Sequence, residues 1–249
     1  MTPKANVLLA SLPRKVLLEM QPDLLPVSLE FGEVLYQTGQ PMRHIYFPGE
    51  CLVSLLVVLE GEPALEVALV GRADVVGLPL ALGAKVSPML ALVQGGGPAL
   101  RVKGPVFMAA MERHPPLKQA VLRAAHILLG QITRTAACNH FHLIEARLAR
   151  WLLMTRDRLG AGEFRMTQDF LSTMLGVRRV CVSAAASSFQ RQSLIEYNRG
   201  YIKILDHAGL EAASCSCYLS GIDDAGALAR WRPPALRSAG AGKGQPLAH

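Results

Sequence analysis

Hydrophobic positions change their spacing near the middle of the chain. From residue 27 onward, short apolar runs such as 52–59 and 65–70 alternate with Gly and Pro turns at close intervals. From residue 115 onward, apolar residues recur every three or four positions, which is the period of an α-helix. An amphipathic stretch over residues 7–20 precedes the first region. The pattern predicts a sandwich or barrel of short strands, introduced by a helix and followed by a mainly helical region.

Residues 115–141 are predicted to form one long helix. Apolar or small side chains follow one another along it at intervals of three or four residues, with the spacing of a coiled-coil seam. Such a helix either pairs with the same helix of a second copy or packs only on its own domain. A second helix is expected over residues 143–159, where Gly160-Ala161-Gly162 ends it.

Residues 166–194 predict two short helices joined by a tight corner. Thr167 is a candidate N-cap, because its hydroxyl can accept a hydrogen bond from a free backbone N–H of the first turn. Gly176 follows the first helix directly, where the chain must turn and glycine tolerates a positive φ. The second helix is expected to begin near Arg178. It carries Val182, Ala185, Ala186 and Phe189 inward and Arg179, Ser183, Ser187 and Gln190 outward.

A β-hairpin is predicted directly after these helices. Residues 195–205 place apolar and aromatic positions on either side of the turn signal Asn198-Arg199-Gly200. A helix start with basic and small residues after a Gly corner is typical of a helix-turn-helix, and the added hairpin makes it a winged helix. The alternative for the two helices alone is an ordinary helical hairpin.

Charge is distributed unevenly between the two halves of the chain. Residues 1–115 carry a net charge of −1, whereas residues 116–249 carry +8, which together give the overall +7. Basic charge in the half with the predicted helix-turn-helix favours binding to phosphates, because each neutralised phosphate releases counterions. A solvated basic surface is the alternative.

The composition narrows the class of protein. The chain has 249 residues, 51% of them hydrophobic, which is enough for two domains with a sizeable core. It has no apolar run near the roughly 20 residues that span a bilayer, and no secretion signal is recognisable. The five cysteines are odd in number and scattered, as expected for thiols in a reducing cytosol. We therefore expect a cytoplasmic protein without membrane association.

Two sets of motifs occur in the strand region and in the winged helix. The first set is Phe31-Gly32-Glu33-Val34-Leu35 with Gly39, Ile45-Tyr46-Phe47-Pro48-Gly49, and Glu66-Val67-Ala68 with Val70-Gly71-Arg72 and Gly77. The second set is Gly176-Val177-Arg178-Arg179 and Val182-Ser183. In this order and at this spacing, over residues 25–218, the chain resembles the Crp/Fnr family of transcription regulators.

The resemblance implies an α+β fold with three parts. It places a β-roll (a cyclic-nucleotide-binding-like jelly roll) in residues 1–114, a dimerisation helix in 115–141 and a winged helix-turn-helix in 142–218. Residues 219–249 are rich in Ala, Gly and Pro and are predicted to be a disordered tail, in which Asp223-Asp224 and Trp231-Arg232 have no assigned role. The resemblance also favours pairing of the long helix with the same helix of a second copy. The residues of this predicted contact are Leu117, Val121, Ala124, Leu128 and Thr135.

One departure from the family pattern concerns the ligand. Relatives that bind cyclic AMP hold its ribose with a Gly-Glu pair and its phosphate with an Arg-Ser pair in one loop. Here Leu78 stands in place of the Glu, and Ser87-Pro88 lies near the expected Arg-Ser, with Lys85 the nearby cation. Because burying an unpaired phosphate is costly, we expect that cyclic AMP does not bind.

Other cofactors receive little support from the sequence. No cysteine precedes Cys51, which argues against an iron–sulfur cluster held by N-terminal cysteines. Haem ligation by His44 or His126 stays open. Cys138, His140 and His142 have weak spacing for zinc and are interpreted as a hinge or interface feature. We therefore predict no metal site and no cofactor, and leave any small-molecule effector unknown.

The function expected from these features is transcription regulation, not catalysis. A homodimer would read a palindromic site in double-stranded DNA with the helix around residues 178–192, and RNA polymerase is the expected protein partner. The alternative is a small-molecule or redox sensor that acts through a protein partner instead of DNA. The residues predicted to contact DNA are Thr167, Gln168, Arg178, Arg179, Val180, Ser183, Ala184, Ser187 and Arg199.

Within that set, the resemblance gives the base-reading positions to Arg179, Val180, Ser183 and Ala184. Arg179 can pair with a guanine, whereas Val180 and Ala184 offer apolar contact, for instance to a thymine methyl group. Arg178 is expected to contact phosphate. Cys181 lies in the same helix as a possible redox switch of DNA binding, the alternative being an inert thiol.

Overall fold

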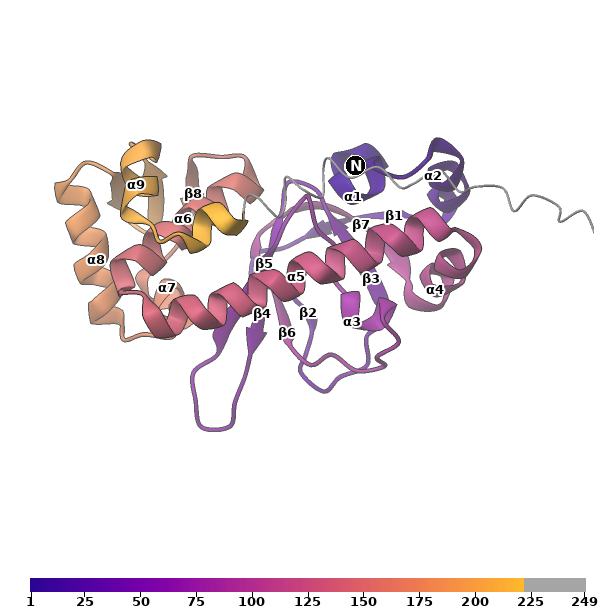
Figure 1. The fold of residues 1–249 in the computed structure, drawn as a ribbon, viewed down its shortest axis with the longest axis horizontal. Helices are drawn as coiled ribbons and strands as arrows, with labels where there is room; N and C mark the ends of the chain where they lie inside the picture. Colours follow the sequence, from indigo (N-terminus) through magenta and orange to yellow (C-terminus); the bar gives the residue numbers. More distant parts are fainter. Residues whose placement is uncertain (222–249) are drawn as a thin grey trace, which may run out of the picture.

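The computed structural model describes residues 1–221 and shows an α+β fold (Figure 1). The chain opens with two short helices, α1 (Val7–Ala10) and α2 (Arg14–Met20), each flanked by a 3-10 turn, η1 (Pro3–Ala5) and η2 (Gln21–Asp23). Pro13 separates the helices that the sequence pattern predicts as one, because proline lacks the N–H that would continue α1. Asn6 caps α1 and donates to the carbonyls of Pro48 and Asp74, which fastens this segment to the strands that follow.

The predicted strand region is a β-roll of two antiparallel sheets. One sheet has the order β1-β7-β3 and the other β2-β6-β4-β5. Leu, Val, Tyr and Ala side chains from both sheets fill the space between them. A second cluster packs the helices against β3 and β7. The strands are β1 (Leu25–Leu29), β2 (Val34–Tyr36), β3 (His44–Pro48), β4 (Leu52–Val57), β5 (Leu65–Val70), β6 (Leu90–Gly95) and β7 (Gly97–Lys103), with helices α3 (Leu78–Ala81) and α4 (Gly104–Arg113) closing one side.

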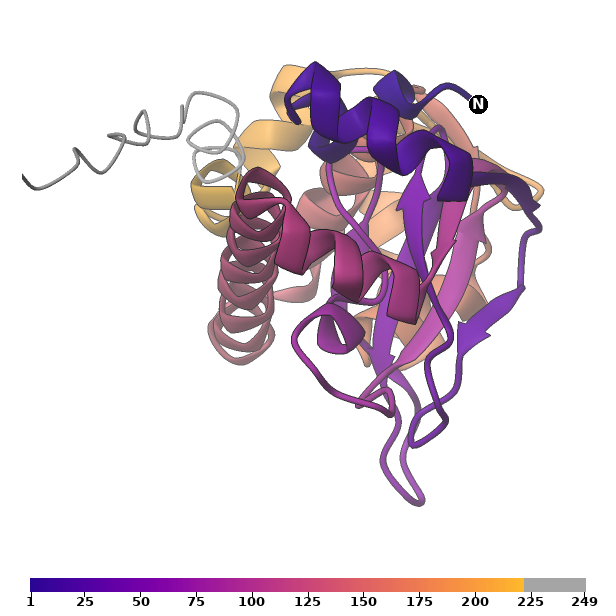
Figure 2. The same cartoon turned by 90° about the vertical axis from the view of Figure 1, so that its right-hand side faces the viewer.

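The long helix α5 (Pro115–Phe141) runs past the roll toward the other end of the molecule (Figure 1). Its bounds confirm the predicted helix at 115–141. Its N-terminal half belongs to the roll, since Leu117 and Val121 have 0% exposure and pack among α1, α2 and α4. One flank of α5 faces away from the roll (Figure 2).

The predicted seam on α5 is wrong for three of its five residues. Leu117, Val121 and Ala124 are buried in the cluster of helices packed on β3 and β7, and Leu128 contacts this cluster and the one between the sheets. Thr135 accepts a hydrogen bond from Arg150 at 3.2 Å. Leu117, Val121 and Ala124 are buried within their own chain and are not available to a second copy. Leu128 and Thr135 are half-buried, and their role in a dimer stays a prediction.

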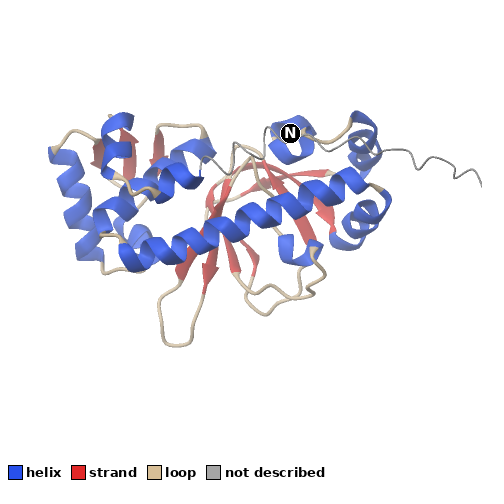
Figure 3. Ribbon diagram, in the orientation of Figure 1, coloured by secondary structure: helices blue, strands red, loops and turns tan. Residues whose placement is uncertain are grey.

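The C-terminal half of the described chain forms the predicted winged helix at the other end of α5 (Figure 3). Helix α6 (Ile144–Leu159) supplies its central apolar face. A small antiparallel sheet of order β8-β10-β9 lies beside the helices. The remaining elements are β8 (Glu163–Arg165), α7 (Gln168–Leu175), α8 (Arg179–Arg191), β9 (Ile195–Asn198), β10 (Tyr201–Ile204) and α9 (His207–Ala213).

The roll and the winged helix share one hydrophobic core. Leu52, Leu56 and Leu69 of the roll pack in the same cluster as Leu148 and Leu152 of α6. Beside this cluster, the buried Glu66 carboxylate accepts hydrogen bonds from Ser54 Oγ at 2.6 Å, Gln94 Nε2 at 3.2 Å and Trp151 Nε1 at 2.8 Å. Because Trp151 comes from α6, this network joins the two parts through polar contacts as well.

Two sequence expectations concern the ends of the described region and its helices. Residues 219–221 are helical, so the predicted disordered tail does not begin at 219, and its remaining part (222–249), including Asp223-Asp224 and Trp231-Arg232, lies outside the described residues. Across residues 1–221, none of the helices combines the length and the apolar character needed to cross a membrane.

Candidate nucleic-acid interface

The corner between α7 and α8 is built as the sequence predicts. Thr167 caps α7, its hydroxyl accepting a hydrogen bond from the N–H of Phe170 at 3.2 Å. Gly176 ends the helix with φ 61° and ψ 41°, and the N–H of Val177 returns to the carbonyl of Ser172 at 3.0 Å. This left-handed turn lets α8 begin only a few residues after α7 ends.

Helix α8 has one buried and one exposed face. Val182, Ala185, Ala186 and Phe189 have at most 2% exposure and pack in the core shared with α6, which confirms their predicted inward direction. The opposite face is uncovered within the described chain, and Val180 is 67% exposed. The exposed residues near its start are Arg178, Arg179, Val180, Ala184 and Ser187.

Two predicted DNA-contacting side chains are already engaged with α7. Ser183 donates a hydrogen bond from Oγ to Oε1 of Gln168 at 2.5 Å, so these two residues lie together across the corner. Arg179 Nε lies 3.3 Å from Oδ1 of Asp169. Both members of this ion pair are more than 60% exposed, so solvent screens it and its free energy is small.

Asp169 is a residue that the sequence interpretation missed. It lies in the first turn of α7, where a carboxylate is favoured by the helix dipole. It also places a negative charge next to the arginine assigned to base reading. Asp169 directly follows Thr167 and Gln168, which are both predicted DNA contacts, and this position could have indicated that it lies at the same surface.

The wing brings a second basic group to the same end of the molecule. Strands β9 and β10 pair from Ile195↔Ile204 to Asn198↔Tyr201, which leaves Arg199 and Gly200 as a two-residue turn. Both have positive φ, 48° and 82°, as a type I′ hairpin turn requires. The N–H of Met166 donates to the carbonyl of Gly200 at 2.6 Å, so the turn is fastened to the strand end that leads into α7.

Cys181 lies half-buried in the first turn of α8. It lies between the exposed start of the helix and the buried face that begins with Val182. Its proposed redox role stays a prediction.

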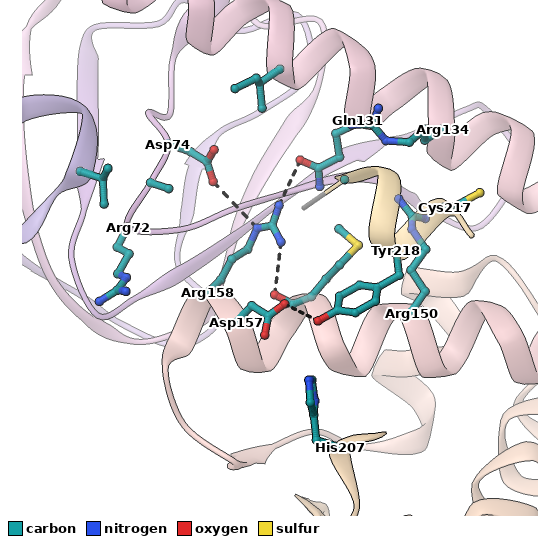
Figure 4. A pocket seen from close by; sticks show the side chains of 15 residues that line it. Arg72, Asp74, Gln131, Arg134, Arg150, Asp157, Arg158, His207, Cys217 and Tyr218 are labelled. Carbon is teal, nitrogen blue, oxygen red and sulfur yellow. Dashed lines mark hydrogen bonds and ion pairs between the residues drawn. The ribbon is translucent and has the colours of Figure 1, made fainter. Parts of the chain in front are cut away.

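A second feature is a cavity of about 530 Å³ where the roll, α5, α6 and the end of the winged helix meet (Figure 4). Arg158 lies at its centre, donating to the carbonyl of Leu69 at 3.1 Å and to Gln131 Oε1 at 3.4 Å. Arg158 also lies 3.9 Å from the carboxylate of Asp74, whose pKa is raised by burial and partly restored by this arginine. The cavity is therefore a polar junction in which one guanidinium from α6 contacts both the roll and α5.

The space beside Gly77, in the loop that the sequence resemblance compares with the cyclic AMP loop of relatives, has a different character. It measures only about 10 Å³ and is lined mainly by apolar side chains, including Leu55, Leu78 and Leu128. Ser87 is buried, and its hydroxyl donates to the carbonyl of Met89 at 2.5 Å.

Comparisons with known proteins agree with this arrangement. Residues 146–213 match the family model described as a Crp-like helix-turn-helix domain. No curated protein sequence matches the chain significantly. The likeness to solved structures extends over most of the chain.

Three of these structures illustrate it. FixK2 from Bradyrhizobium japonicum has a TM-score of 0.67 at 18% identity, covering 78% of this chain and 98% of that one. TTHB099, a CRP-family transcriptional regulator from Thermus thermophilus, gives 0.65 at 20% identity, with 76% and 96% covered. The c-di-GMP-responsive global regulator CLP from Xanthomonas campestris gives 0.64 at 14% identity, with 78% and 100% covered. The shared fold confirms the expected β-roll, long helix and winged helix.

Proposed function

We propose, from the premise that this chain carries a Crp-like helix-turn-helix domain on the fold of Crp/Fnr transcription regulators, that it is a homodimeric regulator binding a palindromic DNA site. The main support for the proposal is the uncovered face of α8, which begins with Arg178 and Arg179. The wing turn at Arg199 adds a further basic group and is fastened to the strand end that leads into α7. RNA polymerase is the protein partner we propose, and the cytoplasm the compartment.

The exposed side chains fall into two groups, those suited to contact base edges and those suited to contact phosphates. Arg179 can place two N–H donors on a guanine edge, and Val180 and Ala184 can contact a thymine methyl in the major groove. Arg178 and Arg199 flank this surface and suit phosphates, together with Thr167 and Ser187. The hydrogen bond between Gln168 and Ser183 would hold both side chains in one orientation at the surface.

We place the dimer contact on the flank of α5 that faces away from the roll. Leu122 is 49% and Leu129 is 63% exposed. These leucines belong to a row with alternating intervals of four and three residues, which is the spacing of a coiled-coil seam. All its members are exposed: Leu122, His126, Leu129, Thr133, Ala136 and His140. Pairing of two copies through this row would set two recognition helices about 34 Å apart.

We propose further that the regulator does not respond to cyclic AMP. The space beside Gly77 is about 10 Å³, far smaller than the several hundred Å³ that a drug-sized ligand occupies. Its lining supplies no cation to a phosphate. Cyclic AMP should therefore leave the melting temperature unchanged, whereas a ligand with a micromolar constant would stabilise by about 2.7 kcal/mol at hundredfold excess.

The function is tested by selecting duplexes from a random DNA library with the full chain and measuring the affinity of the selected sequence against salt. We expect a palindrome with half-sites one helical turn apart and an affinity that falls steeply as salt rises. If no sequence is enriched and the affinity is equal for all DNA sequences, the proposal is contradicted. The protein is then better interpreted as a sensor that acts through a protein partner.

A further inference from the structure

Four side chains that are potential metal ligands meet where α5 ends. Cys138 lies in the last turns of α5 and His142 is its C-terminal cap. Cys215 and Cys217 come from the segment directly after α9. The four ligand atoms, three Sγ and one ring nitrogen, all lie within 4.8 Å of one another.

Two of the distances between ligand atoms match the edges of a tetrahedron around a single ion. Cys138 Sγ lies 3.5 Å from Cys215 Sγ, and Cys217 Sγ lies 3.7 Å from His142 Nδ1. Zn–S bonds of about 2.3 Å and Zn–N bonds of about 2.0 Å in a tetrahedron place neighbouring ligand atoms roughly 3.5–3.8 Å apart. A four-iron cluster needs its cysteine sulfurs much further apart, because each binds a different iron atom.

The surroundings suit a site with negative charge. Cys138 has 1% and Cys215 has 8% exposure, so two of the four ligands are shielded from water. Arg150, itself 7% exposed, lies close enough to act on the Cys138 thiol and would offset the net charge of three thiolates on one divalent ion. A partly buried anion with a fixed cation beside it is the arrangement that metal–thiolate sites require.

We propose that Cys138, His142, Cys215 and Cys217 bind one Zn²⁺ as a closed tetrahedral site. The three thiols pass their protons to solvent as they bind, and His142 binds as the neutral imidazole through Nδ1. All four positions are filled by protein, which is the mark of a structural zinc and leaves none open to a substrate.

The ion would fasten the end of the winged helix to the hinge between α5 and α6. Cys138 and Cys215 are separated by 77 residues in sequence, and the elements between them include both helices of the helix-turn-helix. Holding this loop closed fixes the direction in which the winged helix leaves α5. His140 takes no part, since its side chain is on the exposed flank, and the sequence interpretation of Cys138, His140 and His142 as one trio is replaced by this set.

The first test is the zinc content of the full chain purified with reductant, measured by inductively coupled plasma mass spectrometry. We expect one zinc per chain in the wild type and less than about a tenth in Cys215→Ser and Cys217→Ser. His140→Ala and Cys51→Ala are matched controls that lie outside the four and should keep one zinc. Removing zinc with a chelator should lower the melting temperature by about 5 °C or more, and adding Zn²⁺ back should restore it.

The second test uses Co²⁺ and does not depend on loss of folding. Cobalt in the wild-type site should show the ligand-field bands of a tetrahedral ion and sulfur-to-cobalt charge transfer. His142→Cys supplies a fourth thiolate and should raise the charge-transfer intensity by about one third. Equal zinc in the wild type and both serine variants would overturn the proposal. So would iron with labile sulfide, or a Cys138–Cys215 disulfide in protein that takes up no Zn²⁺ after reduction.

Discussion

At the scale of single residues, the candidate DNA surface depends on which arginine reaches a base. Arg179 lies in the first turn of α8, whereas Arg178 is the residue just before the helix. Arg179→Ala should cost about 1–3 kcal/mol for the selected site and relax the preference at one base position. Arg178→Ala should instead weaken all sequences alike and lower the salt slope by about one. Anisotropy titrations with matched and mismatched duplexes separate the two, and equal profiles for both variants would contradict the assignment.

The neighbouring Asp169 opposes DNA binding if the surface is correctly placed. Its carboxylate lies 3.3 Å from Arg179 and would face the phosphates. Asp169→Asn removes one negative charge and frees Arg179, so we expect about two- to fivefold tighter binding, consistent with an exposed ion pair worth up to about 1 kcal/mol. Glu60→Gln makes the same charge change on the roll and should leave DNA affinity unaltered. A gain in both variants would mean that only net charge matters.

At the scale of secondary-structure elements, α5 uses two faces for two purposes. Its buried face completes the roll, and we propose that its uncovered row joins a second copy. The combined change of Leu122 and Leu129 to Glu should give monomers in multi-angle light scattering, with at least about a hundredfold weaker dimerisation. Leu18→Glu is the matched control, because Leu18 is 55% exposed on α2, away from the row. A dimer that persists in the double variant would place the contact elsewhere.

The same element explains why the first choice of seam failed. Leu117 and Val121 follow the helical period as regularly as Leu122 and Leu129 do, and a period cannot say which apolar row meets which neighbour. Burial decides it: the first pair is 0% exposed inside one protomer. Val121→Glu should therefore destabilise the fold and would not report on dimerisation.

At the scale of the whole molecule, the buried Glu66 network makes stability depend on pH. Burial raises the pKa of Glu66 to about 7, and hydrogen bonds from Ser54 and Trp151 only partly offset this. A raised carboxyl pKa means that the folded state holds a proton that the unfolded state has released. The contribution of Glu66 to the free energy of unfolding is therefore fully present below about pH 4.5 and is lost as pH rises through about 7.

Glu66→Gln tests this dependence. The raised pKa of Glu66 corresponds to a change of about 3 kcal/mol in the free energy of unfolding. The free energy of unfolding of the wild type should fall relative to that of the variant between about pH 4.5 and 7. Glutamine can still accept from Trp151, so the network keeps its contact with α6. Parallel urea-unfolding profiles for the two proteins across this pH range would show that Glu66 does not titrate there.

The sequence by itself determined the elements and their order. Local signals were sufficient for this: the Thr167 cap, the Gly176 corner and the Arg199-Gly200 turn act on neighbouring residues, and each is found as expected. The alternation of Gly and Pro turns with short apolar runs likewise predicted the strands of the roll. These local signals did not show which face of a periodic helix is buried, for instance which face of α5 is covered.

Only the tertiary structure decided which distant side chains meet. Glu66 and Trp151 are 85 residues apart, and Cys138 and Cys215 are 77 apart, so no local spacing relates them. The sequence did not link Cys215 and Cys217 to Cys138 and His142, because the whole helix-turn-helix lies between the two pairs in the chain. Packing of the winged helix against α5 and the roll creates both groupings. A local pattern specifies an element, whereas a buried network or a ligand cluster exists only once the elements are packed together.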